Sequence, residues 1–132
     1  RRGTISKMAK LKVLVVDDDE TMLQAIWMWL YSAGHEVVTR STPFGTSQQI
    51  LRMEPDVVML DLDMPGLRGE TLAEMIRGKQ RATSVIFYSG KEPAELQDLA
   101  RTYGALGAIH KSVHGDDFVR LFQKLTSRLG AI

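Results

Sequence analysis

Short apolar runs alternate along the chain with segments whose apolar residues recur every three or four positions. The short runs are typical of buried strands, and the helical period is typical of amphipathic helices. Strands are predicted over residues 12–16, 36–40, 57–60, 84–88 and 105–110. Helices are predicted between the capping residue Asp19 and Gly34, and over residues 43–53, 69–79, 93–103 and 116–129. On the last helix, the residues expected to face inward are Phe118, Leu121, Leu125 and Leu129.

Strand and helix therefore alternate five times, with short links between them. Such alternation predicts an α/β fold, a five-stranded parallel sheet that is doubly wound, with right-handed crossovers placing helices on both faces. We expect the flavodoxin-like strand order 2-1-3-4-5. A chain of 132 residues suffices for one domain. We assign that domain to residues 11–129, with an N-terminal arm or tag remnant over 1–10 and a tail over 130–132.

Composition narrows the function classes. A net charge of +1 gives no electrostatic case for nucleic acid or an anionic membrane. The chain has no cysteine, which excludes disulfides, thiolate metal sites and cysteine catalysis. No apolar run approaches the length of a membrane span, and no signal-peptide core is present, so we expect a cytoplasmic protein. No DNA-binding segment follows Leu129, which leaves a stand-alone protein or a piece of a larger one.

Carboxylates stand where two of the predicted strands end. The run 13–16 leads into Asp17, Asp18 and Asp19, and the run 57–60 leads into Asp61. In a doubly wound sheet, ligands bind beyond the carboxyl ends of the strands, where the strand order reverses, and here that place lies between the first and third strands. Clustered carboxylates repel one another unless a cation lies among them. We therefore expect a site for a hard cation such as Mg²⁺, which prefers oxygen ligands.

A hydroxyl and an ammonium group follow the fourth and fifth predicted strands, at the same edge of the sheet as the carboxylates. Ser89 follows the fourth strand, and Lys111 follows the fifth. A hydroxyl and an ammonium group suit the oxygens of a phosphoryl group, and a carboxylate can act as the nucleophile that accepts it. Singly, each residue has an ordinary explanation, as a helix cap, a turn residue or a solvated charge. Their joint position at one edge of the sheet favours phosphoryl chemistry.

Four short motifs carry these residues in order: Val16-Asp17-Asp18, Leu60-Asp61 with Met64-Pro65-Gly66, Tyr88-Ser89-Gly90 and His110-Lys111. Together they resemble the receiver domain of two-component response regulators, over roughly residues 11–129. The resemblance implies that Asp61 accepts a phosphoryl group from a phosphohistidine on a histidine kinase or a histidine phosphotransfer protein.

The resemblance also implies the roles of the surrounding residues. Asp18, Asp61 and the backbone carbonyl of Asp63 would bind Mg²⁺, with Asp17 acting through water. Ser89 and Lys111 would hold the phosphoryl oxygens. Self-catalysed phosphorylation and dephosphorylation, without turnover of a substrate, are the expected chemistry.

Two positions depart from the usual receiver pattern. Ser112 follows the lysine in place of proline, so we expect a trans peptide or a more mobile loop. Ala108 replaces the aromatic residue that switches rotamer in the family, so the output signal must use another element. Asp63 and Lys91 flank the path of the hydrolytic water in the family. We hypothesise that these two residues pair in the resting state and modulate the lifetime of the aspartyl phosphate.

The first predicted helix carries more apolar residues than one buried face needs. A first face comprises Met22, Ala25, Ile26, Trp29, Leu30 and Ala33. A second stripe, at helical spacing, comprises Leu23, Trp27 and Tyr31, with Met28 beside it. Either the last helix or the N-terminal arm covers this stripe, or it is a partner face for a helical phosphotransfer domain or a second copy of the chain.

Two other function classes stay open on the sequence alone. The segment Asp61-Leu62-Asp63 also resembles the nucleophile motif of haloacid-dehalogenase-type phosphatases, with Gly115-Asp116-Asp117 as a later motif. Against that class, the chain is short, lacks a cap insertion and would leave Asp17 and Asp18 idle. The third class is a receiver-like interaction module that works without phosphorylation.

Overall fold

A computed structural model describes residues 9–65, 71, 73, 74, 76 and 82–129. Its centre is a five-stranded sheet in which every neighbouring pair is parallel and the order is β2-β1-β3-β4-β5. The strands are β1 (Lys12–Val16), β2 (Glu36–Arg40), β3 (Val57–Asp61), β4 (Ser84–Ser89) and β5 (Gly107–His110). The predicted fold class and strand order are confirmed.

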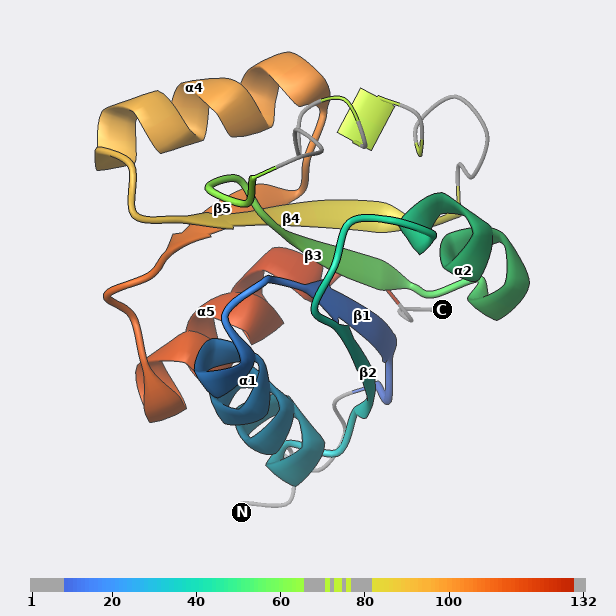
Figure 1. Ribbon diagram of the computed structural model, residues 1–132. Helices are drawn as coiled ribbons and strands as arrows, with labels where there is room; N and C mark the ends of the chain where they lie inside the picture. The colour runs from blue at the N-terminus through green and yellow to red at the C-terminus, as the bar shows by residue number, and fades with distance from the viewer. Residues whose placement is uncertain (1–8, 66–70, 72, 75, 77–81, 130–132) are drawn as a thin grey trace.

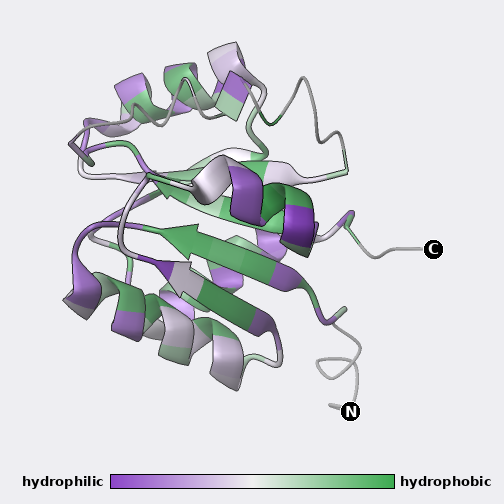
Figure 2. Cartoon of the chain, turned by 45° about the vertical axis from the view of Figure 1, so that its right-hand side comes forward, coloured by the Kyte–Doolittle hydropathy of each residue, from purple (hydrophilic) through white to green (hydrophobic). Residues whose placement is uncertain are grey.

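Helices cover both faces of the sheet, which Figure 1 shows as a layer above and a layer below the strands. The described helices are α1 (Glu20–Ser32), α2 (Thr46–Met53), α4 (Pro93–Tyr103) and α5 (Gly115–Thr126). One apolar cluster joins the sheet to α1 and α5, and a second joins it to α2 and α4. The strands in the middle are hydrophobic almost throughout (Figure 2) because both of their faces are covered. Within the described residues, no helix is long and apolar enough to cross a membrane.

Two helix ends follow the predicted capping chemistry. The Asp19 side chain accepts hydrogen bonds from the backbone N–H groups of Thr21 and Met22, which caps α1. Gly104, with a φ of 72°, ends α4 in the left-handed conformation that glycine adopts without strain. The predicted helix over 69–79 lies largely outside the described residues.

The predicted start of the second helix at Pro43 is wrong by three residues. A turn precedes the helix, in which the Thr46 N–H donates to the Pro43 carbonyl, and α2 begins only at Thr46. Gly45 has a φ of 77°, which is incompatible with a helical turn at that position. The carbonyl of Phe44 accepts hydrogen bonds from the Arg40 guanidinium, which anchors the turn to β2.

The buried face of α5 is centred differently from the prediction. Phe118, Phe122 and Thr126 are fully buried at a spacing of four residues, and Leu121, Leu125 and Leu129 are only half-buried beside them. The prediction for Phe118 is confirmed, whereas the three leucines are less buried than predicted and Phe122 was missed. The two phenylalanines contact aromatic rings of other elements, since Phe118 packs on Trp29 and Phe122 packs on His35. This face of the core therefore depends on aromatic packing.

The burial of His35 predicts that the free energy of unfolding decreases at acid pH. This side chain is buried, its Nδ1 accepts the Leu11 N–H at 3.1 Å, and burial lowers its pKa. The folded protein therefore keeps His35 neutral where the unfolded chain, with an ordinary pKa near 6.5, begins to bind a proton. Stability should fall as the pH drops below about 6.5, at up to about 1.4 kcal/mol per pH unit from this group.

Chemical denaturation between pH 5 and 7.5 of the wild type and His35→Gln would measure this decrease. All other titrating groups are present in both proteins, so the difference in slope belongs to His35. The variant should show the shallower fall on the acid side, and parallel curves would contradict the assignment.

Candidate functional site

Three carboxylates meet at the carboxyl end of the sheet. Asp17 follows β1, Asp61 is the last residue of β3, and Asp18 lies beside them, with one oxygen of each within 4.8 Å of the others. Asp17 and Asp61 are only 1% and 2% exposed, whereas Asp18 is exposed. Because β1 and β3 are adjacent in the sheet, two strands distant in sequence bring these groups together.

Asp17 is held in place from both sides. Its N–H donates to the Arg40 carbonyl of β2, and its Oδ1 accepts the Asp19 N–H at 2.9 Å. Burial raises the pKa of the Asp17 carboxyl to about 7, and the nearby Asp61 carboxyl adds to the rise. Its Oδ2 is buried and has no hydrogen-bond partner among the described residues.

An orphaned carboxylate oxygen beside two further carboxylates is a suitable environment for a hard cation. The donor set consists of oxygen alone, which fits Mg²⁺. The residues present therefore fit the metal that the sequence led us to expect.

Lys111 is the cation of the site. It follows β5, and its Nζ lies 3.0 Å from Asp61 Oδ1 and 3.5 Å from Asp63 Oδ2. Burial alone would lower the pKa of this ammonium group, but its hydrogen bond to Asp61 and the charges of Asp61, Asp17 and Asp63 raise it above the ordinary value. Lys111 is therefore charged and directed at the carboxylate that ends β3.

Ser89 and Asp63 complete the arrangement beside Asp61 and Lys111. The buried Ser89 hydroxyl lies 3.1 Å from Asp63 Oδ1, and the Gly90 N–H donates to Asp63 Oδ2. The Asp63 N–H donates to Asp61 Oδ1 at 2.8 Å. Burial tends to raise the pKa of Asp63, but the hydrogen bonds from Gly90 and Ser89 and the charge of Lys111 lower it overall.

The hypothesis that Asp63 pairs with Lys91 is wrong for this structure. The cation that approaches Asp63 is Lys111, and among the described residues no ion pair joins Asp63 to Lys91. Lys91 takes part through its backbone, whose N–H donates to the Ser89 hydroxyl at 3.0 Å. Asp63 pairs with Lys111 because Lys111, at the end of β5, extends its side chain to Asp63.

A family model for the response regulator receiver domain matches residues 13–123. The chain belongs to this family. The matched range includes the acidic cluster, Ser89 and Lys111.

Curated relatives and solved structures agree with this membership. The chain is 33% identical over 107 residues to the transcriptional regulatory protein KdpE of Mycobacterium tuberculosis, and covers 47% of that protein. It is 33% identical over 109 residues to a protein-glutamate methylesterase/protein-glutamine glutaminase of Nitrobacter winogradskyi, and covers 26% of it. A receiver domain from Clostridium thermocellum superposes with a TM-score of 0.78 at 29% identity, over 89% of this chain and 94% of that one.

These relatives carry different activities in their names, and the chain matches only part of each. The chain spans about half of KdpE and about a quarter of the methylesterase. Sequences similar to this chain therefore occur within proteins of different named activities. The phosphatase interpretation loses its support, because the chain has receiver membership and because Asp116 and Asp117 lie in the first turn of α5, outside the acidic cluster.

Tyr88 lies beneath Lys111, a contact that was not predicted from the sequence. Its ring is buried beneath Lys111, whose Nζ lies 5.8 Å from the ring centre, and its hydroxyl has no hydrogen-bond partner among the described residues. Burial raises the pKa of this hydroxyl, so it stays protonated. The available signal was its position immediately before Ser89. Ala108 is buried, and the described residues contain no cis peptide bond, so the peptide between Lys111 and Ser112 is trans, one of the two alternatives expected there.

The stripe predicted on α1 is partly wrong. Leu23 is buried with Ile26 and Leu30, because residues three and seven apart share a helix face. Trp27, Met28 and Tyr31 are 39%, 54% and 59% exposed, so α5 does not cover them. Residues 1–8 of the predicted arm lie outside the described residues.

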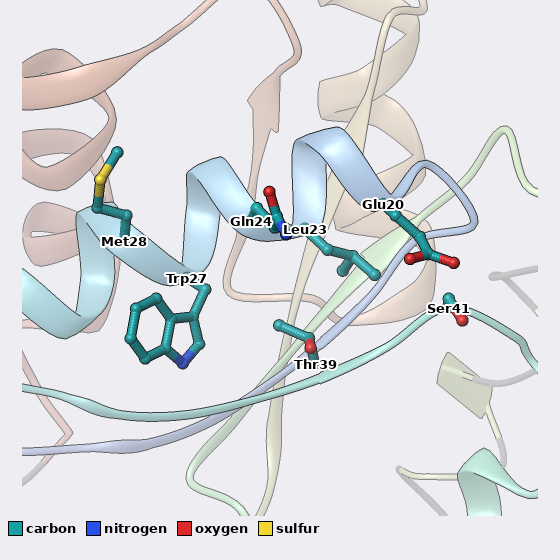
Figure 3. Close-up of a pocket in the computed structure, with 7 residues that line it drawn as sticks. All are labelled: Glu20, Leu23, Gln24, Trp27, Met28, Thr39 and Ser41. Carbon is teal, nitrogen blue, oxygen red and sulfur yellow. The ribbon is translucent and has the colours of Figure 1, made fainter.

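Trp27 lines two neighbouring grooves between α1 and β2. One is lined by Glu20, Leu23, Gln24, Trp27, Met28, Thr39 and Ser41, and the other by Lys10, Trp27, Tyr31 and residues 34–37. Figure 3 shows the indole of Trp27 extending from α1 toward the strand that carries Thr39. The Trp27 ring also stacks on Tyr31, with 4.7 Å between ring centres. We call Trp27, Met28 and Tyr31 the α1 patch.

Proposed function

We propose that this receiver domain accepts a phosphoryl group on Asp61 from a phosphohistidine of a histidine kinase or histidine phosphotransfer protein, and that this changes its interactions with partners. The observation that carries the proposal is the contact of Lys111 Nζ with Asp61 Oδ1 at 3.0 Å, beside the Asp17 and Asp18 carboxylates. A carboxylate that contacts a fixed ammonium group at the end of a buried strand is positioned for nucleophilic attack on phosphorus.

The step conserves atoms and charge. An Asp61 carboxylate oxygen forms a bond to phosphorus, the bond between phosphorus and the imidazole nitrogen breaks, and the imidazole leaves with that electron pair. Lys111 and Ser89 hold the phosphoryl oxygens as negative charge develops on them. The Ser89 hydroxyl must first exchange its contact with Asp63 for one with the phosphoryl group.

Mg²⁺ would be held by Asp18, Asp61 and the backbone carbonyl of Asp63, with Asp17 acting through water. The ion would supply charge neutralisation between the carboxylates and the incoming phosphoryl group. The orphaned Asp17 Oδ2 and the all-oxygen donor set support this assignment. We propose no turnover of a separate substrate, so the chemistry is one phosphorylation and its hydrolysis.

The acceptor can be located by chemical trapping. Borohydride reduces an aspartyl phosphate to homoserine, which peptide mass mapping identifies by position. After incubation with acetyl phosphate and Mg²⁺, homoserine should appear at residue 61. Homoserine at another aspartate would contradict the proposed acceptor.

Asp63 and Lys91 are proposed to modulate the lifetime of the phosphorylated state. Asp63 holds Ser89, Gly90 and Lys111 together, and the Lys91 backbone holds the Ser89 hydroxyl, so both residues border the phosphoryl position. Asp63→Asn should change the dephosphorylation rate by about three- to tenfold, the effect of one altered polar contact. Lys91→Ala keeps the backbone N–H that holds Ser89, so it tests whether the Lys91 side chain beside the site also changes that rate. The rate is measured by loss of the phosphoryl adduct after the donor is removed, and unchanged rates in both variants would contradict the role.

The α1 patch is proposed as the docking face for the phosphohistidine donor, because its helix begins next to Asp17 and Asp18 and the patch is exposed and apolar. Trp27→Glu should slow phosphotransfer from a cognate donor about tenfold or more, the loss expected when an aromatic anchor is removed from an interface. Phosphorylation by acetyl phosphate should be unchanged.

Phe44→Glu is the matched control for the α1 patch. Phe44 is a 74% exposed aromatic residue before α2, so this variant adds the same charge away from the patch. Equal losses with both donors in Trp27→Glu would indicate misfolding. A concentration-dependent mass of the unphosphorylated chain that Trp27→Glu abolishes would instead assign the patch to a second copy.

A further inference from the structure

Both polar groups of one peptide unit beside Lys111 are bound by imidazoles. The carbonyl of Lys111 lies 2.9 Å from His114 Nε2. The N–H of Ser112 donates to His110 Nδ1 at 3.1 Å, and the Ser112 hydroxyl lies 2.8 Å from the same nitrogen. The peptide unit between Lys111 and Ser112 is therefore held from two sides.

The partners fix the tautomer of each ring. A carbonyl oxygen only accepts hydrogen bonds, so His114 Nε2 must carry a hydrogen. His110 Nδ1 accepts the Ser112 N–H, so it carries none, and the neutral ring bears its hydrogen on Nε2. The Ser112 hydroxyl then donates to the same Nδ1.

The remaining backbone bonds around Lys111 are made by neighbouring strands and turns. The Lys111 N–H donates to the Ser89 carbonyl at 2.9 Å, and the Val113 N–H donates to the His110 carbonyl at 3.0 Å across a tight turn. The His114 ring also packs against Trp29 of α1, with 5.6 Å between ring centres. The loop is thus tied to β4 and to α1, and within the described residues the Lys111–Ser112 peptide unit is bonded by the two imidazoles alone.

From these contacts we infer that His110 and His114 are positioning residues, which clamp the Lys111–Ser112 peptide unit and so place Lys111 Nζ against Asp61. The inference rests on the proposed function of Lys111 in phosphoryl transfer. Ser112, the residue after Lys111, has a backbone N–H, which a proline at this position would lack. This N–H donates the hydrogen bond to His110 Nδ1. A histidine two residues before the anchored N–H acts here as asparagine does in an Asx turn.

This analogy supplies a conservative variant. His110→Ala removes the acceptor, whereas His110→Asn keeps a side-chain oxygen that reaches the N–H two residues ahead. We expect amide hydrogen exchange at Ser112 to be about three- to tenfold faster in His110→Ala than in the wild type, and to return most of the way in His110→Asn. Phosphorylation of Asp61 by acetyl phosphate with Mg²⁺ should slow by a similar factor in His110→Ala and recover in His110→Asn.

The two readouts separate failure of the clamp from failure of the proposed function. Unchanged Ser112 exchange in His110→Ala would overturn the clamp. Faster exchange with unchanged phosphorylation would overturn its positioning role. A wild type that takes no phosphoryl group would contradict the proposed function instead. In that case the exchange rate at Ser112 and the nitrogen chemical shifts of His110 would still show whether the clamp exists. Those shifts must show a hydrogen on Nε2 and none on Nδ1, and the reverse tautomer would overturn the clamp.

Discussion

Replacing Lys111 by alanine should slow phosphorylation of the domain by acetyl phosphate about a hundredfold or more, the cost of removing a fixed charge that stabilises the transferring phosphoryl oxygens. The structure gives the reason, because Lys111 Nζ lies 3.0 Å from Asp61 and is the side chain whose ion pairs join Asp61 and Asp63. Its loss leaves the approaching phosphoryl group opposite a cluster of carboxylates with only the metal to neutralise charge.

The matched control for this variant is Lys124→Ala. Lys124 is an exposed lysine on α5, so its removal changes the net charge equally without touching the site. Initial rates of phosphoryl incorporation for the two variants, at saturating Mg²⁺, make the comparison. Equal rates in Lys111→Ala and the wild type would contradict the role assigned to Lys111.

The largest effect on stability should come from Phe118→Ala, which we expect to lower the free energy of unfolding by about 3–5 kcal/mol. Phe118 is fully buried, and its ring packs against Trp29 at 5.1 Å and Tyr88 at 6.2 Å between ring centres. Removing it opens a cavity between α5, α1 and β4, where rigid aromatic neighbours limit collapse.

Chemical denaturation of Phe118→Ala, with Phe44→Ala as the control, measures this effect. Phe44 is an exposed phenylalanine and should change the free energy of unfolding by about 0.5 kcal/mol or less. A loss below about 1 kcal/mol in Phe118→Ala would mean that the residues around Trp29 and Tyr88 repack, and would contradict a rigid aromatic core at this place.

The strands, and the carboxylates that stand at their ends, could be predicted because burial of a strand on both faces follows a local rule. Strands buried on both faces are continuous apolar runs, as residues 57–60 show, and every residue of β3 is buried. The strand order then places Asp17 and Asp61 on adjacent strands, and their carboxylates meet in the structure. No contact had to be known for that prediction.

The errors arose where tertiary contacts choose between similar residues. Leu23 and Trp27 both suit an apolar helix face, and only the orientation of α1 on the sheet decides that Leu23 is buried. Phe122 was missed because it packs against residues distant in the chain, among them His35. The same holds for Asp63, whose partner is Lys111 at the end of β5 rather than Lys91. Such choices require the packed structure.

The central claim is that Asp61 accepts one phosphoryl group in a metal-dependent reaction. Intact mass spectrometry after incubation with acetyl phosphate, on the wild type and Asp61→Asn with and without Mg²⁺, tests it most directly. We expect a single phosphoryl adduct on the wild type that is absent in Asp61→Asn and absent without Mg²⁺. An adduct that persists in Asp61→Asn, or a folded wild type that takes none from either acetyl phosphate or a phosphohistidine donor, would contradict the claim.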